Sequence, residues 1–360
     1  SNNTAVGDSA LESATADKNT AVGADALKAN TTGTQNVAVG SNALDASTTA
    51  DGNVAVGHAS LGANTTGAQN ISIGTGALGA NTTGTQNVAV GSLALDANTT
   101  ANNNTAVGYQ ALSENTTGTS NTAVGALALD ANTTANNNTA VGKSALSATT
   151  TGVSNTGIGL QALNANTTGQ HNVAVGKDAG VNITTGQKNV VVGSEALYTN
   201  TTGVQNVSVG YNSLFNNNQN NNVAVGYNCM FANTSGTRNV AIGNSSLDAN
   251  TTADDCTAVG HEALTNNTTA HDNTAVGRQS LFSNSTGTGN TAIGKDASRQ
   301  NTTANNNTSV GYQALYANTT GFENVAVGSL ALDANTTGDE NTAIGYKALS
   351  ANTTANGNTA

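Results

Sequence analysis

Hydrophobic and polar residues alternate over short stretches that recur along the whole chain. Each stretch contains Asn, a β-branched residue, a small residue, Val or Ile, and Gly, as in Asn87-Val88-Ala89-Val90-Gly91. Alternating β-branched residues are typical of a β-strand, in which both branched side chains face the same side. The pattern therefore predicts one short strand in each stretch, and the Gly ends it.

The spacing of these stretches is almost constant. The Gly occurs 21 times, with 18 spacings of 17 residues and two of 16, at positions 7, 23, 40, 57, 74, 91, 108, 125, 142, 159, 176, 193, 210, 226, 243, 260, 277, 294, 311, 328 and 345. A disordered linker keeps a composition but not a register this strict. Seventeen residues are fewer than the ~20–29 of a leucine-rich repeat, which holds a strand and a helix. We predict an all-β fold, a parallel β-solenoid (β-roll) of about 21 turns, as one continuous array over residues 1–360.

Two positions of the repeat indicate how its turns stack. The Gly suggests a corner that needs a positive φ or leaves no room for a Cβ. An Asn precedes the strand in 20 of 21 copies, with Cys256 as the exception, and amides stacked in register can form a hydrogen-bonded ladder. Representative residues are Gly91, Gly108 and Gly125 for the corner and Asn87, Asn104 and Asn121 for the ladder.

The aliphatic residues form two columns, Val or Ile next to the Gly, and Leu four residues after it in 18 of 21 copies. We expect small and β-branched residues to fill the interior, and the Asn ladders to follow the edges. The direction of the Leu stays open, because the Gly corner breaks the alternation of faces. If one column fills the interior, the other is a continuous apolar stripe, which monomers rarely expose. Self-association, as a homotrimer or a filament, is therefore a hypothesis.

The repeat resembles the YadA-like head repeats of trimeric autotransporter adhesins and the related repeats of phage tail fibres. Residues 87–94, N-V-A-V-G-S-L-A, are close to the family core N-S-V-A-I-G-x-x-[S/A]. The family's usual repeat is shorter, and here the Asn lies one position closer to the Gly. The resemblance implies a left-handed parallel β-roll, three chains around one axis and attachment to surfaces. The extra residues leave handedness and the shape of the turn open.

Composition narrows the classes of function. Only 9% of residues are charged, Pro and Trp are absent, and the 10 Lys and Arg are spread along a chain of net charge -11. No face can neutralise phosphates, so nucleic acid is not an expected partner. No run of 18 apolar residues and no signal peptide occur, so we expect no membrane insertion. Glycans on the many N-T-T sequons would collide at ~4.8 Å spacing, which favours a bacterial or viral origin.

Residues with catalytic or metal-binding chemistry are few. No nucleophile elbow, H-E-x-x-H motif, P-loop or calcium repeat occurs, so we expect no enzyme, metal or cofactor. His261 and His271, each followed by an acidic residue, form a weak candidate metal pair, and solvated turn residues are the favoured interpretation. Cys229 and Cys256 fall in different columns about two turns apart, so we expect both to be unpaired.

Aromatic residues concentrate in two positions of the repeat, directly after the Gly and directly after the Leu. Ten of the eleven lie there, and five occupy three successive turns beside the shortened repeat: Tyr198, Tyr211, Phe215, Tyr227 and Phe231. Such a patch is a candidate site for a cell-surface glycan or protein, bound by stacking. The favoured alternative is that these rings cover a defect in the shortened turn or a contact between chains.

The combined pattern predicts an extracellular fibrous shaft, located on a cell surface or virion, of the adhesin or tail-fibre type. It would mediate attachment through many repeated contacts. The alternatives are a purely structural filament subunit and an ice-binding solenoid, the latter weakened because a two-column Thr-x-Thr array is absent. Because the chain starts and stops within the repeat without a capping turn, we expect it to be a segment of a longer fibrous protein.

Overall fold

The computed structural model describes residues 2–360, which divide into two compact units at Thr185 and Gly186. All regular secondary structure in these residues is β, in strands of three residues. The first unit contains β1 (Thr4–Val6), β2 (Thr20–Val22), β3 (Val37–Val39), β4 (Val54–Val56), β5 (Ile71–Ile73), β6 (Val88–Val90), β7 (Thr105–Val107), β8 (Thr122–Val124), β9 (Thr139–Val141), β10 (Thr156–Ile158) and β11 (Val173–Val175). The second contains β12 (Val190–Val192), β13 (Val207–Val209), β14 (Val223–Val225), β15 (Val240–Ile242), β16 (Thr257–Val259), β17 (Thr274–Val276), β18 (Thr291–Ile293), β19 (Thr308–Val310), β20 (Val325–Val327) and β21 (Thr342–Ile344).

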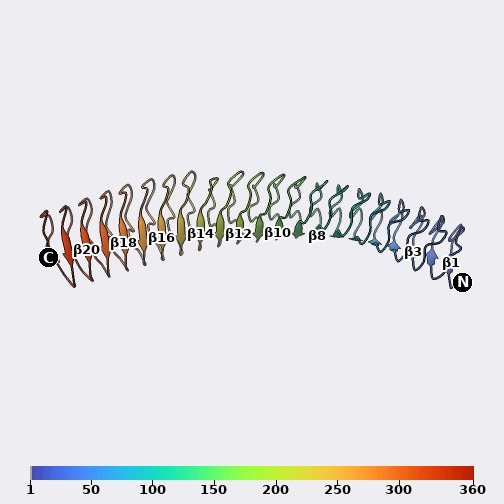
Figure 1. Cartoon of the computed structure of the whole chain (residues 1–360), viewed down its shortest axis with the longest axis horizontal. Helices are drawn as coiled ribbons and strands as arrows, with labels where there is room; N and C mark the ends of the chain where they lie inside the picture. Colours follow the sequence, from blue (N-terminus) through green and yellow to red (C-terminus); the bar gives the residue numbers. More distant parts are fainter. Residues whose placement is uncertain (1) are drawn as a thin grey trace. The chain divides into compact units, whose positions relative to one another are not determined.

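Within each unit, every strand pairs in parallel with the next strand of the sequence. The register equals the repeat, so that Val88 lies opposite Thr105 in the first unit and Thr257 opposite Thr274 in the second. Successive strands lie side by side and point the same way, with one loop of chain between them (Figure 1). The prediction of a parallel β-solenoid with a 17-residue repeat is confirmed within each unit. That both units form one continuous array stays a prediction.

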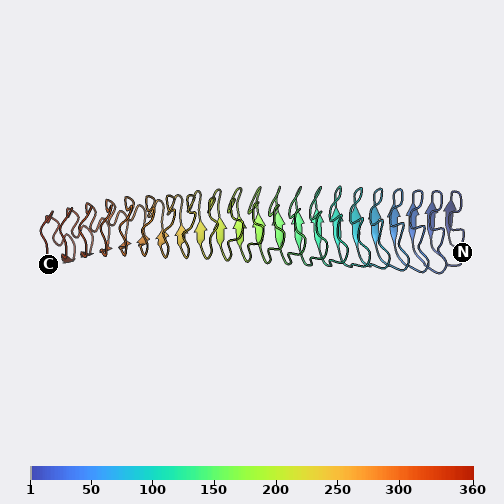
Figure 2. The same ribbon diagram turned by 90° about the horizontal axis from the view of Figure 1, so that it is seen from above.

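The rest of each turn is also hydrogen-bonded to its neighbour, although it is not strand. Leu27 N–H donates to Ala43 C=O at 3.0 Å, and Thr31 N–H donates to Thr48 C=O at 2.9 Å. Each turn is therefore held to the next by several lines of hydrogen bonds. Figure 2 shows the turns of each unit from a second direction, stacked at regular intervals. Stability comes from contacts between neighbouring turns, as in other repeat proteins.

The Gly at the end of each strand meets both predicted requirements. Its φ is between 129° and 147° in every turn, a region that side chains rarely adopt. A Cβ on Gly108 would lie 2.7 Å from the carbonyl carbon of Gly125, too close for any side chain. Gly91 and Gly125 have the same environment, so all three representative glycines are corner residues.

The interior differs from the expectation that β-branched residues fill it. Ala89 and Leu95 are fully buried, whereas Val190 and Ile242 of the strands are 40% and 41% exposed. The middle strand residue, the small residue after the corner and the Leu therefore point inward, and the β-branched pair points outward. The reason is space: a Cβ on Gly157, a middle strand residue, would lie 3.1 Å from Leu146 Cγ. A narrow interior that contains Leu has room for only a small residue opposite.

The first Asn ladder uses the Asn that precedes each strand. Asn104 N–H donates to Asn87 Oδ1 at 3.0 Å, and Asn121 N–H donates to Asn104 Oδ1 at 2.9 Å. Asn104 Nδ2 donates to Gly118 C=O at 2.8 Å. These amides are fully buried. The predicted ladder is confirmed, but its expected position along the edges is wrong, because the amides satisfy backbone groups inside the turns.

A second Asn ladder uses the Asn of the N-T-T segment. Asn98 Nδ2 donates to Asn81 Oδ1 at 2.8 Å, and Asn115 Nδ2 donates to Asn98 Oδ1 at 3.1 Å. Asn98 Nδ2 also donates to Ala101 C=O within its own turn at 3.1 Å. This ladder therefore joins side chain to side chain, and it closes each turn at the same time. Buried amides of this kind are costly to leave unpaired.

Candidate binding surfaces

Two outward positions of each turn carry ten of the eleven aromatic side chains. We call the residues directly after the repeat Gly the corner column, and those directly after the Leu position the shoulder column. Corner tyrosines are strongly exposed, as Tyr109 and Tyr312 show at 54% and 45%. Shoulder aromatics such as Phe282 and Tyr316 are half-buried. Of the two, the corner column is thus the more accessible to a partner.

The predicted aromatic patch divides between these columns. In the corner column, Tyr211 and Tyr227 stack with ring centroids 5.8 Å apart and 16° between their planes, and they remain 45% and 51% exposed. In the shoulder column, Phe215 lies between Tyr198 and Phe231, with centroids 4.9 Å and 5.2 Å apart. The structure therefore brings the five residues together as two stacks.

Stacking determines which ring surfaces are free. Each of the five rings turns at least one face toward a neighbouring ring, and Phe215 turns both. Aromatic pairs in this geometry contribute about 0.5–1.5 kcal/mol beyond their burial. Tyr211 and Tyr227 each have one stacked face, and the rest of each side chain accounts for its exposure of 45% and 51%. The shoulder stack serves mainly to pack the turns together.

The shortened repeat beside the stacks is closed by an Asn side chain. Elsewhere the first Thr of N-T-T donates its N–H to a backbone carbonyl of the next turn, as Thr31 does to Thr48. Here the Oδ1 of Asn218 accepts from the N–H of Thr201 at 2.8 Å and from the N–H of Thr202 at 3.1 Å. The side chain of Asn218 thus supplies an acceptor in the shortened repeat, where other turns use a backbone carbonyl.

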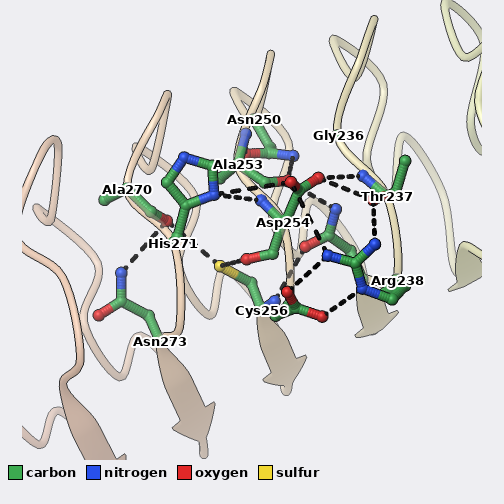
Figure 3. Close-up of polar contacts among 12 residues, drawn as sticks. Gly236, Thr237, Arg238, Asn250, Ala253, Asp254, Cys256, Ala270, His271 and Asn273 are labelled. Carbon is green, nitrogen blue, oxygen red and sulfur yellow. Dashed lines mark hydrogen bonds and ion pairs between the residues drawn. The ribbon is translucent and has the colours of Figure 1, made fainter.

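A charged cluster on three successive turns was not predicted from the sequence (Figure 3). Arg238 pairs with Asp255 through Nε at 2.7 Å and Nη2 at 2.8 Å. Asp254 Oδ1 accepts from Thr237 N–H at 2.6 Å, and Asp254 N–H donates to His271 Nδ1 at 2.9 Å. Hydrogen bonding to Arg238 lowers the pKa of the Asp255 carboxyl. Opposite charges one repeat apart are the signal that could have found this pair.

The two His singled out by the sequence remain apart. His271 Nδ1 is occupied by the Asp254 N–H, and His261 Nδ1 lies 3.5 Å from the carboxylate of Glu262. No group of three or more metal-ligating side chains exists in residues 2–360. The arrangement is that of solvated turn residues.

Both cysteines are buried and unpaired, as predicted. Burial raises the pKa of the Cys229 thiol to about 12 and that of Cys256 to about 11. Thiols of this kind are poor nucleophiles at neutral pH. Cys256 takes the place of an Asn in the first ladder, and its sulfur, a weak acceptor, faces the backbone N–H of Asn273 in place of an amide oxygen.

The outward face of the strands is a third surface. Its third position is Val or Ile in all strands, and its first is Thr, Val or Ile. In the second unit, Val190, Val192 and Ile242 are 36–41% exposed. The face has no charged residue and no strand with two outward Thr. It is a flat, mainly apolar surface.

Concave sites are absent from the part of the chain that the structure describes: it contains no cavity. Nor does it contain a helix long and apolar enough to cross a membrane. Comparison with models of known protein families finds no match, and neither does comparison with curated protein sequences. The functional argument therefore rests on the outward surfaces themselves.

Proposed function

We propose that this chain is the shaft of an extracellular attachment fibre of the adhesin or tail-fibre type, on a cell surface or virion. The observation that carries the proposal is the constant register, which sets variable side chains outward at every turn. Turns repeat ~4.8 Å apart, so weak contacts on many turns add as multivalent binding. The resemblance to YadA-like head repeats supports the same function.

The proposal includes association between copies of the chain, with a homotrimer as the resemblance implies. The uncharged outward face of the strands supports it, because it exposes aliphatic side chains on successive turns, such as Val124, Val141 and Ile158. Monomers rarely leave an apolar surface of this kind in water. The mass of the protein in light scattering tests this part: three chains per particle are expected, and a monomeric mass would contradict it.

The aromatic patch is the first candidate for contact with a surface glycan or protein. Tyr211 and Tyr227 present hydroxyls and ring edges, which suit a polar and partly apolar ligand. The experiment compares attachment of beads coated with the full chain to cells and to immobilised glycans, before and after Tyr211→Ser combined with Tyr227→Ser. Weaker attachment is expected, with a melting temperature lowered only slightly by the loss of the stacked pair, so that the chain stays folded. Unchanged attachment would remove the patch from the proposal, and no attachment by the unaltered chain would remove the proposal itself.

A further inference from the structure

The corner column of the second unit differs from that of the first in charge. Three consecutive turns of the second unit carry His261, Arg278 and Lys295, with Tyr227 before them and Tyr312 after. The column has no acidic residue in this unit; its members are Ser194, Tyr211, Tyr227, Asn244, His261, Arg278, Lys295, Tyr312, Ser329 and Tyr346. In the first unit, basic corner residues such as Lys143 never occupy adjacent turns.

The three basic side chains are available to a ligand. Arg278 is exposed and forms no ion pair or hydrogen bond among the described residues through its guanidinium. Lys295 is exposed, lies 3.7 Å from a carboxylate oxygen of Asp296 and is placed 5.5 Å from the ring centroid of Tyr312. His261 is also exposed, beside Glu262. Arg278 is therefore the free member of a pair of cations on adjacent turns, Arg278 and Lys295, with His261 on the turn before.

Nearby carboxylates do not neutralise the positive charge of this row. Glu262 accepts a hydrogen bond from Gln279 Nε2 at 2.7 Å. Asp296 is nearly buried and is shared by Lys295 and Arg299, each at 3.7 Å. Arg278, Lys295 and Arg299 thus face two carboxylates, which leaves a local positive charge on a chain of net charge -11. An anion is attracted here and repelled over most of the rest.

We propose that this row, Tyr227 to Tyr312 of the corner column, binds an extended polyuronate, a polysaccharide with one carboxylate on each sugar. The inference rests on the proposed attachment function and names its ligand. Turns repeat ~4.8 Å apart, comparable with the length of one pyranose residue, so one carboxylate can meet one cation per turn. The Arg278 guanidinium matches a carboxylate in two parallel hydrogen bonds. Tyrosine hydroxyls and edges at both ends contact sugar hydroxyls.

The aromatic geometry favours a sugar chain over single-stranded nucleic acid. Bases bind such proteins by stacking on free aromatic faces. Here one face of Tyr227 is covered by Tyr211, and Lys295 lies over the ring of Tyr312. Hydroxyls and edges remain exposed, and these suit sugars.

The test measures binding of the full chain to immobilised polygalacturonate at low salt, with neutral dextran as the matched polysaccharide. Arg278→Ser combined with Lys295→Ser is expected to weaken binding about tenfold. Lys143→Ser, the same change at an isolated corner cation of the first unit, is expected to have no effect, and Arg278→Lys is expected to retain most of the binding. Raising the salt concentration should weaken binding of the unaltered chain.

Several results would overturn the inference. They are equal binding to dextran, an equal loss with Lys143→Ser, or tighter binding to an oligothymidylate than to polygalacturonate. Melting temperatures of all variants show whether each is folded; these side chains are exposed, so no change is expected. Attachment of beads to cells separates the two proposals. Attachment that survives Arg278→Ser with Lys295→Ser contradicts the polyuronate site alone, whereas absent attachment contradicts the attachment function.

Discussion

The second Asn ladder is continuous in one part of the first unit and broken in another. From Asn81 to Asn132, each Asn donates its Nδ2 to the Oδ1 of the Asn in the preceding turn, at 2.8–3.1 Å, beginning with the bond from Asn81 to Asn64. Thr149 and Ile183 then occupy the ladder position. The Oδ1 atoms of Asn132 and Asn166, one turn before each break, have no hydrogen-bond partner. The ladder is directional: a replaced Asn leaves the preceding amide oxygen without its donor.

The break at Ile183 is accompanied by a second change that explains it. The same turn has Gly180 where 18 of the 21 turns have Leu. The side chain of Ile183 is fully buried, and its Cδ1 would lie 2.9 Å from a Cβ on Gly180. The Ile therefore fills the volume that the missing Leu leaves, and the turn exchanges a hydrogen bond for apolar packing.

Breaking the continuous part of the ladder should have the largest effect. Asn98→Ala removes the donor to Asn81 Oδ1 and the acceptor of Asn115, and we expect a loss of about 2–4 kcal/mol in the local free energy of unfolding. Hydrogen exchange of the neighbouring turns measures it. Thr100→Ala, an exposed position of the same turn, is the control and should change exchange little. Equal effects of the two variants would contradict the ladder's role.

Mending the break at Ile183 should stabilise the chain only when both positions change. In a Val191→Ala background, which gives β12 the small middle residue of most other strands, Gly180→Leu with Ile183→Asn restores the usual sequence pattern and a donor for Asn166, with an expected gain of about 1–3 kcal/mol. Ile183→Asn alone empties the core volume, and Gly180→Leu alone collides with the Ile, so each single variant should be destabilised. Urea denaturation of the four proteins gives the coupling. Additive effects would show that the residues do not share one volume.

The first ladder of the second unit has its own break at Cys256, which offers a smaller gain. Cys256→Asn replaces the weak sulfur acceptor of the Asn273 N–H by an Oδ1, and we expect a gain of about 1 kcal/mol. Cys256→Ala removes the thiol without adding the acceptor and should bring no gain. Both melting temperatures are compared. An Asn variant no more stable than the Ala variant would mean that the N–H of Asn273 is satisfied in another way.

Replacing Asp130, a shoulder-column carboxylate beside the continuous part of the ladder, should have the smallest effect on stability. This effect should depend on pH. Burial raises the pKa of Asp130, whose Oδ1 has no partner. The carboxyl thus contributes stability that is present below its unfolded pKa of about 3.9 and lost as pH rises through the higher folded pKa. Asp130→Asn should raise the melting temperature slightly at pH 7, and the difference should shrink in acid. A difference in melting temperature that does not change with pH would show that the carboxylate charge is not its cause.

Much of the fold could be predicted because one short pattern, with the same local conformational preferences, recurs along the whole chain. Alternation located the strands, and the Gly and Asn positions predicted a corner and a ladder, as Gly108 and Asn104 show. The candidate patch was predicted less completely. Its residues follow from their spacing, but the mutual stacking of Tyr198, Phe215 and Phe231 depends on how side chains tilt between turns. The Arg238–Asp255 pair was missed because each charge was considered within its own turn.

The sequence by itself determined the repeat length, the position of each strand and the residues that stack in register. Only the tertiary structure decided which side of each strand is inside. The reason lies in the corner, where the Gly is followed by two more residues with positive φ, such as Asp25 at 56° and Leu27 at 52°. Residues in the left-handed region break the alternation of side-chain directions. The inward or outward direction counted along the strand therefore does not predict the direction of side chains after the corner. In the structure the Leu side chains point inward, the middle residue of most strands is Ala, and the Val and Ile of the strands point outward.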